Sequence, residues 1–145
     1  MTDRWLDTSQ HPLHALVFPP HYTYEELDEQ MNYMRDEYRR FVRERPHDLC
    51  VIVVDVSRVE RSEPRNRKRI IEGIGELTGL METRLVAQAY VTDRTLIRAA
   101  LTAVSWLYTP PWPVQVFARR AEADHWLHER LEEAQRGGTR RRRSG

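Results

Sequence analysis

A basic run between Arg58 and Arg69, where a loop is expected to lead into a helix, is the part of this sequence best equipped for binding chemistry. Its six cations are Arg58, Arg61, Arg65, Arg67, Lys68 and Arg69. Ser62 and Pro64 mark the predicted start of the helix, whose amino end carries a partial positive charge. Cations are mildly unfavourable there, so either a partner brings an anion or the long side chains extend into water. Both interpretations stay open, and we place a partner contact here.

A second candidate contact is aromatic. Trp112 lies between Pro111 and Pro113, close to Trp106 and Tyr108. Core packing and anchoring of the loop explain most of this cluster, whereas Trp112 is expected as an exposed recognition contact. Stacking on nucleic-acid bases finds no support, because no RNA-binding motif accompanies the aromatic residues.

Residue patterns for catalysis or metal binding are missing from the sequence. The six histidines form no HExxH motif, and His125 and His128 lie three apart on a helix face that looks solvated. With only six glycines, the chain has no phosphate-binding loop and no nucleophile elbow. Asp55 follows a strand but has no catalytic partner at a recognisable spacing, so its expected role is to cap a turn. We therefore expect no enzyme, no metal and no cofactor.

Short apolar segments alternate with amphipathic helices along the chain. The predicted strands are residues 15–18, 49–54, 85–91 and 114–117, with a further edge strand at 4–6. The segment 49–54 is apolar throughout, which is typical of a strand covered on both faces. A capping box at Thr23 and Glu26 starts the first helix, and three more helices follow the later strands.

This alternation predicts an α/β single domain. Strands separated by helices of 15 to 20 residues form βαβ crossovers, so we expect a mostly parallel central sheet of four to five strands with four helices. In such sheets ligands and partners meet the carboxyl ends of the strands. The loops there are predicted at residues 19–23, 55–64, 92–95 and 118–121.

Composition limits the class of protein and its location. A chain of 145 residues with 40% hydrophobic and 31% charged residues is expected to be a soluble globular protein. Its longest apolar run has six residues, far below the roughly 20 that cross a membrane. The first 18 residues contain no apolar secretory segment, and the single cysteine, Cys50, lies within an apolar strand. We expect a cytoplasmic protein.

The carboxyl-terminal segment differs from the rest of the chain. Residues 136–145 hold five arginines and no acid, which leaves 18 basic against 22 acidic residues in residues 1–135. Gly137 and Gly138 are a helix stop signal, and nothing apolar follows them. We therefore expect an α/β domain at residues 1–135 and a disordered arginine-rich tail at residues 136–145.

Three segments carry a resemblance to a known family. They are the capped helix start at 23–27, the strand and turn at 51–57, and residues 116–127, where Phe117 is followed by Glu122-Ala123 and Trp126-Leu127. The helix around 98–106 adds to the likeness. Over residues 13–131 the chain resembles a STAS-like domain of the SpoIIAA-like branch, the α/β module of anti-sigma-factor antagonists and sulfate-transporter tails.

The resemblance implies a module that docks a protein partner, such as a regulator, kinase or scaffold, and that does no catalysis. Some members are switched by phosphorylation of a serine after an Asp-x-Ser strand exit. The matching zone is 55–64, which makes Ser57 and Ser62 the candidate phosphorylation sites. The family's usual Asp-Ser-Ser-Gly is absent, and Glu63 after Ser62 supplies a permanent negative charge there.

These observations give one main hypothesis and one alternative. We expect a non-catalytic regulatory or scaffold module whose strand-exit loops and second helix bind a protein. The partner-binding residues are Arg58, Arg61, Ser62, Arg65, Arg69 and Trp112. The alternative is a module that binds a small lipid or anionic metabolite, because related folds hold such ligands between helices and sheet. Self-association stays open, and neither a membrane span nor nucleic-acid binding is expected.

Overall fold

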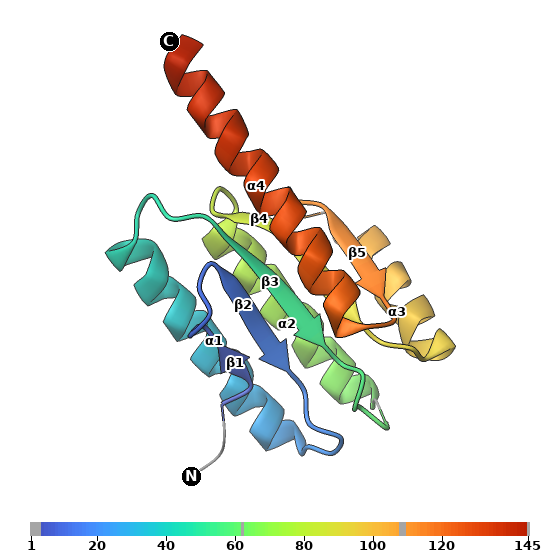
Figure 1. Ribbon diagram of the computed structural model, residues 1–145. Coiled ribbons are helices and arrows are strands. Elements are labelled where there is room, and N and C mark those ends of the chain that lie inside the picture. The colour runs from blue at the N-terminus through green and yellow to red at the C-terminus, as the bar shows by residue number, and fades with distance from the viewer. Residues whose placement is uncertain (1–3, 62, 108–109, 145) are drawn as a thin grey trace.

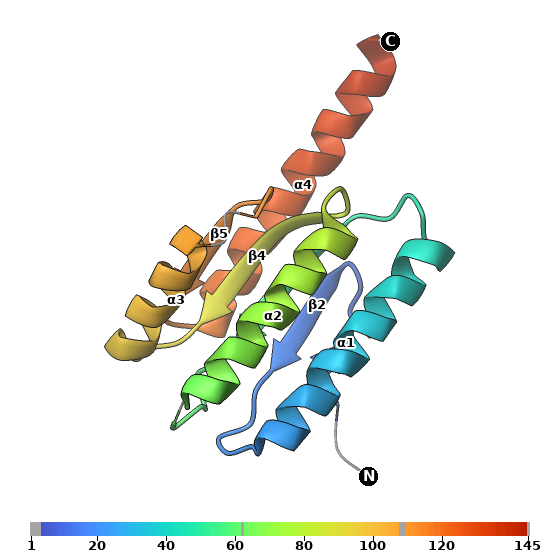
Figure 2. The ribbon, with the colours of Figure 1, turned by 180° about the vertical axis from the view of Figure 1, so that it is seen from behind.

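A five-stranded sheet lies between two layers of helices in the computed structural model, which describes residues 4–61, 63–107 and 110–144 (Figures 1 and 2). The strands are β1 (Leu6–Asp7), β2 (Leu13–Val17), β3 (Cys50–Asp55), β4 (Leu85–Val91) and β5 (Val114–Phe117). The helices are α1 (Tyr24–Glu44), α2 (Pro64–Met81), α3 (Thr95–Leu107) and α4 (Arg120–Ser144).

The strands follow one another across the sheet in sequence order, from β1 to β5. Only β1 and β2 are antiparallel, and every later pair is parallel. Because successive right-handed crossovers in one direction leave their helices on one side, α1, α2 and α3 cover the same face (Figure 2). After the last strand α4 covers the opposite face (Figure 1). The expected mostly parallel α/β fold with four helices is confirmed.

Each face of the sheet has its own apolar core. In β3, Ile52 faces the cluster beneath α1 and α2, while Val51 and Val53 face the cluster beneath α4. All three side chains are fully buried, which confirms the prediction that this strand is covered on both faces. On the α4 side, Ala87 and Ala89 leave room for the helix to pack closely. The loops lie where the strands end. We call the side of the sheet at which the parallel strands β2 to β5 end the carboxyl edge, and the side at which they begin the amino edge.

Most predicted boundaries agree with the structure. The strands expected at residues 85–91 and 114–117 have those bounds, and the edge strand expected at 4–6 is β1, one to two residues later. The capping box of α1 is present, since the Thr23 side chain accepts from the backbone of Glu26 at 3.1 Å. No helix in the described ranges is long and apolar enough to cross a membrane.

Two helices differ from expectation. In α3, Ile97 and Leu101 pack against the core, but Leu96 is 85% exposed, although an amphipathic helix is expected to bury its leucines. This helix covers only the part of the sheet beside β5, the last strand. That area is too narrow to bury a broader stripe of the helix. α4 continues beyond Gly137 to Ser144, past the predicted stop, and its last turns project beyond the sheet (Figure 1). The predicted disorder of residues 136–145 stays a prediction.

Helices α1 and α2 approach each other closely at Gly73. A Cβ atom at this position would lie 2.8 Å from Sδ of Met31, which is itself buried. We expect Gly73→Ala to lower the free energy of unfolding by about 1–3 kcal/mol, because the two helices must move apart or Met31 must repack. Urea unfolding monitored by circular dichroism measures this loss.

The same helix supplies a matched control. Gly79 is exposed, and a Cβ there would meet nothing within 4 Å. Gly79→Ala should therefore raise the free energy of unfolding by about 0.5–1 kcal/mol, as expected for the higher helix propensity of alanine. Equal effects of the two substitutions would contradict the close approach at Gly73.

Candidate functional site

The loop between β3 and α2 is held in place by contacts at the carboxyl edge of the sheet. Arg94, which follows β4, donates from Nη1 to the carbonyl oxygens of Val59 at 2.7 Å and Glu60 at 3.1 Å. The Glu60 amide donates to the Pro20 carbonyl at 3.3 Å, and the Glu60 carboxylate lies 3.3 Å from His21. Val59 is buried in the core. Neighbouring loops and the core therefore fix the backbone of this loop at Val59 and Glu60.

A turn at the end of β3 uses the carboxylate of Asp55. Oδ1 of Asp55 accepts from the Ser57 amide at 3.0 Å and from the Ser57 hydroxyl at 2.6 Å. The expected turn-capping role of Asp55 is thus observed. A phosphate on Ser57 would remove this donor and put negative charge beside the carboxylate, so the local geometry opposes modification at Ser57.

Five of the predicted cations are exposed in this loop and the first turns of α2. We call this segment the cationic surface, and its residues are Arg58, Arg61, Arg65, Arg67 and Lys68. Arg65 stacks on the ring of Tyr24, 3.7 Å from its centroid, which ties the segment to the start of α1. Three of the predicted contact residues, Arg58, Arg61 and Arg65, are therefore accessible.

The amino end of α2 begins differently from the prediction. Glu63 is the N-cap residue, its side chain makes no capping hydrogen bond, and the first turn contains no acid. Ser62, expected to cap the helix and to be a phosphorylation site, lies outside the described residues. The amino end of α2 thus combines a helix dipole with neighbouring cations and no side-chain cap.

Arg69 does not belong to the cationic surface. Its side chain is 6% exposed and donates from Nε to Asp28 at 2.7 Å and from Nη2 to Asn32 at 3.0 Å. Both acceptors belong to α1, so Arg69 joins the two helices. The expectation of an accessible contact at this position was wrong, because it lies on the face of α2 that packs against α1.

Trp112 is likewise buried rather than exposed. Its side chain is 5% exposed, and Nε1 donates to Oε1 of Gln88 at 3.1 Å. The residue precedes β5, so it lies at the amino edge, whereas Arg58 lies at the carboxyl edge. Trp112 was expected to be an exposed recognition contact, and this burial contradicts that expectation.

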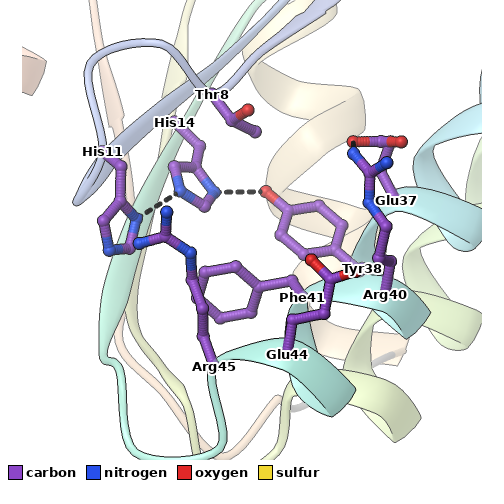
Figure 3. A pocket seen from close by; sticks show the side chains of 9 residues that line it. All are labelled: Thr8, His11, His14, Glu37, Tyr38, Arg40, Phe41, Glu44 and Arg45. Carbon is purple, nitrogen blue, oxygen red and sulfur yellow. Dashed lines mark hydrogen bonds and ion pairs between the residues drawn. The ribbon is translucent and has the colours of Figure 1, made fainter.

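A cavity of about 170 Å³ opens at the amino edge, between the loop before β2 and the end of α1 (Figure 3). The lining residues are Thr8, His11, His14, Glu37, Tyr38, Arg40, Phe41, Glu44 and Arg45. Two ion pairs hold its rim, Arg40 with Glu37 at 2.6 Å and Arg45 with Asp48 at 3.1 Å. The cavity is therefore polar at its mouth and aromatic at its base.

Two histidines and a tyrosine form a chain of hydrogen bonds beneath this cavity (Figure 3). Nδ1 of His11 lies 2.9 Å from Nε2 of His14, and Nδ1 of His14 lies 2.9 Å from the Tyr38 hydroxyl. On its other side, Nε2 of His11 lies 3.3 Å from the carboxylate of Asp48. The chain thus runs from a partly exposed carboxylate to a phenol in the core.

Burial sets the electrostatics of this chain. Desolvation, together with the charges of His11 and Arg45, lowers the pKa of His14 to about 4. Burial also raises the pKa of Tyr38 well above its ordinary value. Both groups are therefore neutral at pH 7. The Cys50 thiol, at the start of β3, is equally buried, and its pKa is raised to about 12, so it is protonated as well.

Sequence reasoning missed this chain. A histidine inside the apolar strand β2 and a tyrosine on the buried stripe of α1 were its only signals. No group of three or more His, Cys, Asp or Glu in the described ranges is placed to hold a metal ion. His125 and His128, the pair that sequence reasoning did consider, are exposed on α4.

Comparison of the chain with models of protein families, with curated proteins and with solved structures found no match.

Proposed function

We propose that the protein is a non-catalytic, cytoplasmic regulatory or scaffold module of the STAS-like type, and that its cationic surface binds an acidic segment of a protein partner. The observation that carries the proposal is an anchored loop with exposed cations. Arg94 fixes the backbone of this loop at Val59 and Glu60. A surface that is ordered before binding loses little conformational entropy when a partner docks.

The pairing of charges supports an acidic partner. Arg58, Arg61 and Lys68 have no ion pair in the described part of the chain, whereas Arg40 and Arg45 of the cavity rim each have one. Unpaired cations beside a positive helix end attract negative charge and accelerate encounter with an acidic surface. Carboxylate or phosphate groups of a partner would supply the missing charge.

The STAS-like assignment rests on the order of the elements and on the sequence segments that resemble this family. The five-stranded mixed sheet with four helices is compatible with it. Some members of this family are switched by phosphorylation of a serine between the exit of a strand and the following helix, and in this chain the matching segment joins the end of β3 to the start of α2. The proposed contact therefore coincides with the cationic surface.

Charge reversal of two residues tests the proposal. At low salt we expect the double variant Arg58→Glu/Arg61→Glu to capture at least tenfold less partner than the wild type, because two attractive charges become repulsive. The measurement is quantitative mass spectrometry after affinity capture from nuclease-treated lysate. Stability should change by less than about 0.5 kcal/mol, since both side chains are exposed.

Arg39 and Arg43, both exposed in the last turns of α1, give a matched control with the same change of charge. Arg39→Glu/Arg43→Glu should capture the same partner as the wild type. Equal losses in both variants, or none in either, would move the interface away from the cationic surface. Native mass spectrometry of the purified protein covers the alternative function: a bound mass of small-molecule size would favour a ligand in the cavity.

A further inference from the structure

The chain of Asp48, His11, His14 and Tyr38 has only one arrangement of hydrogens that satisfies both of its ends. The Tyr38 hydroxyl is buried, and within the described part of the chain its hydrogen-bond partner is Nδ1 of His14, at 2.9 Å. If Tyr38 donates to that nitrogen, His14 must carry its hydrogen on Nε2 and donate to Nδ1 of His11. His11 then carries its hydrogen on Nε2.

The exposed end leads to the same assignment. The carboxylate of Asp48 can only accept, and at 3.3 Å it favours a hydrogen on Nε2 of His11. Neutral His11 then has a free lone pair on Nδ1, which accepts from His14. Each link therefore holds one hydrogen, and every hydrogen points from the core towards the surface.

We propose that this chain is an acid-sensitive latch, which ties the loop of residues 8–12 to α1 while both histidines are neutral and releases it when the pair takes up a proton. The latch lies at the amino edge of the sheet, so it is independent of the partner contact proposed at the carboxyl edge.

One added proton breaks the chain whichever ring receives it. If His11 takes the proton at Nδ1, its new N–H group faces the N–H group of His14 across 2.9 Å. If His14 takes the proton at Nδ1, or moves its own hydrogen there, the Tyr38 hydroxyl becomes the acceptor and its hydrogen loses its partner. Either state loses a buried hydrogen bond, which opening of the loop relieves because both rings then reach water.

The groups around the pair favour the neutral state. Asp7 of β1 and Cys50 of β3 lie near it, and the remaining charged or titratable neighbours come from α1 and the loop that follows. These are Glu37, Tyr38, Arg40, Glu44, Arg45 and Asp48. Glu37 and Asp48 are each paired with an arginine, so their charges are partly compensated. Burial then dominates and keeps a proton off His14 until the loop opens.

The loop that the latch holds has few other attachments. Within the loop, the His11 amide donates to the Thr8 carbonyl at 3.1 Å. In the described part of the chain three hydrogen bonds tie the loop to strands: the Ser9 amide donates to Oδ1 of Asp7 at 2.8 Å, the Leu13 amide to the Gln10 carbonyl at 3.0 Å, and the Val51 amide to the Pro12 carbonyl at 2.9 Å. Local opening thus breaks few bonds, which makes the histidine chain a large part of what closes the loop.

Nuclear magnetic resonance of the wild-type imidazole nitrogens tests the hydrogen arrangement directly. At pH 7.5 we expect both His11 and His14 to be neutral with the hydrogen on Nε2. A hydrogen on Nδ1 of His14 would overturn the proposal. This measurement needs no variant, so it decides the question even if substitutions in the core prevent folding.

Hydrogen exchange tests the release. Between pH 7.5 and 4.5 the protection of the His11 and Leu13 amides, corrected for the intrinsic pH dependence, should fall at least about tenfold, since the open loop binds a proton that the closed loop does not. In His11→Gln/His14→Gln this fall should disappear. Glutamine can donate from its amide nitrogen and accept at its oxygen in the same direction along the chain, but it cannot take up a proton.

A matched control comes from the other histidine pair spaced three residues apart. His125→Gln/His128→Gln makes the same change on the exposed face of α4 and should keep the wild-type pH dependence. Unchanged pH dependence in the His11/His14 variant, or its loss in the control, would show that other groups release the loop.

Discussion

Val53→Asp is expected to unfold the domain or to lower its free energy of unfolding by at least about 4 kcal/mol. Val53 is fully buried in β3, and its neighbours in register on the adjacent strands are Ala15 and Ala89. Neither side chain can pair with a carboxylate. On the α4 side the cluster around Val53 is apolar, so the charge would have no compensating partner there. Thermal and urea unfolding measure the effect.

Two further variants should lower the free energy of unfolding by smaller amounts and so serve as controls. Val53→Thr keeps the shape of the side chain and buries one hydroxyl, so a loss of about 1–3 kcal/mol is expected. Gln115→Asp puts the same carboxylate on an exposed position of β5 and should cost less than about 1 kcal/mol. An unchanged melting temperature in Val53→Asp would be incompatible with a central position of β3.

The sequence identified Val53 correctly because a continuous apolar run reports burial on both faces without reference to any other part of the chain. Arg69 shows where such reasoning fails. The buried positions of α2 are Asn66, Arg69, Gly73, Leu77 and Met81, spaced by three or four residues. Polar residues and a glycine occupy the first three, so the periodicity of apolar residues gives no sign that Arg69 is buried.

The prediction that Trp112 is exposed was wrong for a related reason. Its proline neighbours are typical of an exposed loop, and burial depends on a partner that is distant in sequence, the Gln88 side chain of β4. Gln88 also donates to the Tyr90 hydroxyl at 3.1 Å, so one polar side chain within an apolar strand serves two aromatic residues. A glutamine in a buried strand signals that polar partners will converge on it, but not which ones.

The histidine chain could not be predicted from spacing, because its members come from four different segments. His14 interrupts the apolar strand β2, and Tyr38 lies on the buried stripe of α1, so each predicts a polar partner in the core. That they satisfy each other follows only from the packing of α1 against the sheet. His11 and Asp48, which complete the chain, belong to loops whose positions no local pattern determines.

The stability of the protein should also depend on pH through His14, with a loss of about 3 kcal/mol as the pH falls from 6.5 to 4. The pKa of His14 is about 4 in the folded protein, against an ordinary value of 6.5 for histidine. Between these values the unfolded chain binds a proton that the folded chain does not. Stability contributed by neutral His14 is therefore fully present above pH 6.5, falls with decreasing pH, and levels off below pH 4.

Urea unfolding at intervals from pH 7.5 to 4 measures this dependence, and the difference between variants isolates His14 from the carboxylates. His14→Gln should remove about 1.4 kcal/mol per pH unit from the slope near pH 5, and this change of slope is the quantity to compare with the wild type. Should His14→Gln not fold, a nuclear magnetic resonance titration of wild-type His14 replaces it, with an expected midpoint below pH 5. A midpoint near 6.5 would mean that the ring reaches water in the folded state, since only an exposed imidazole keeps its ordinary proton affinity.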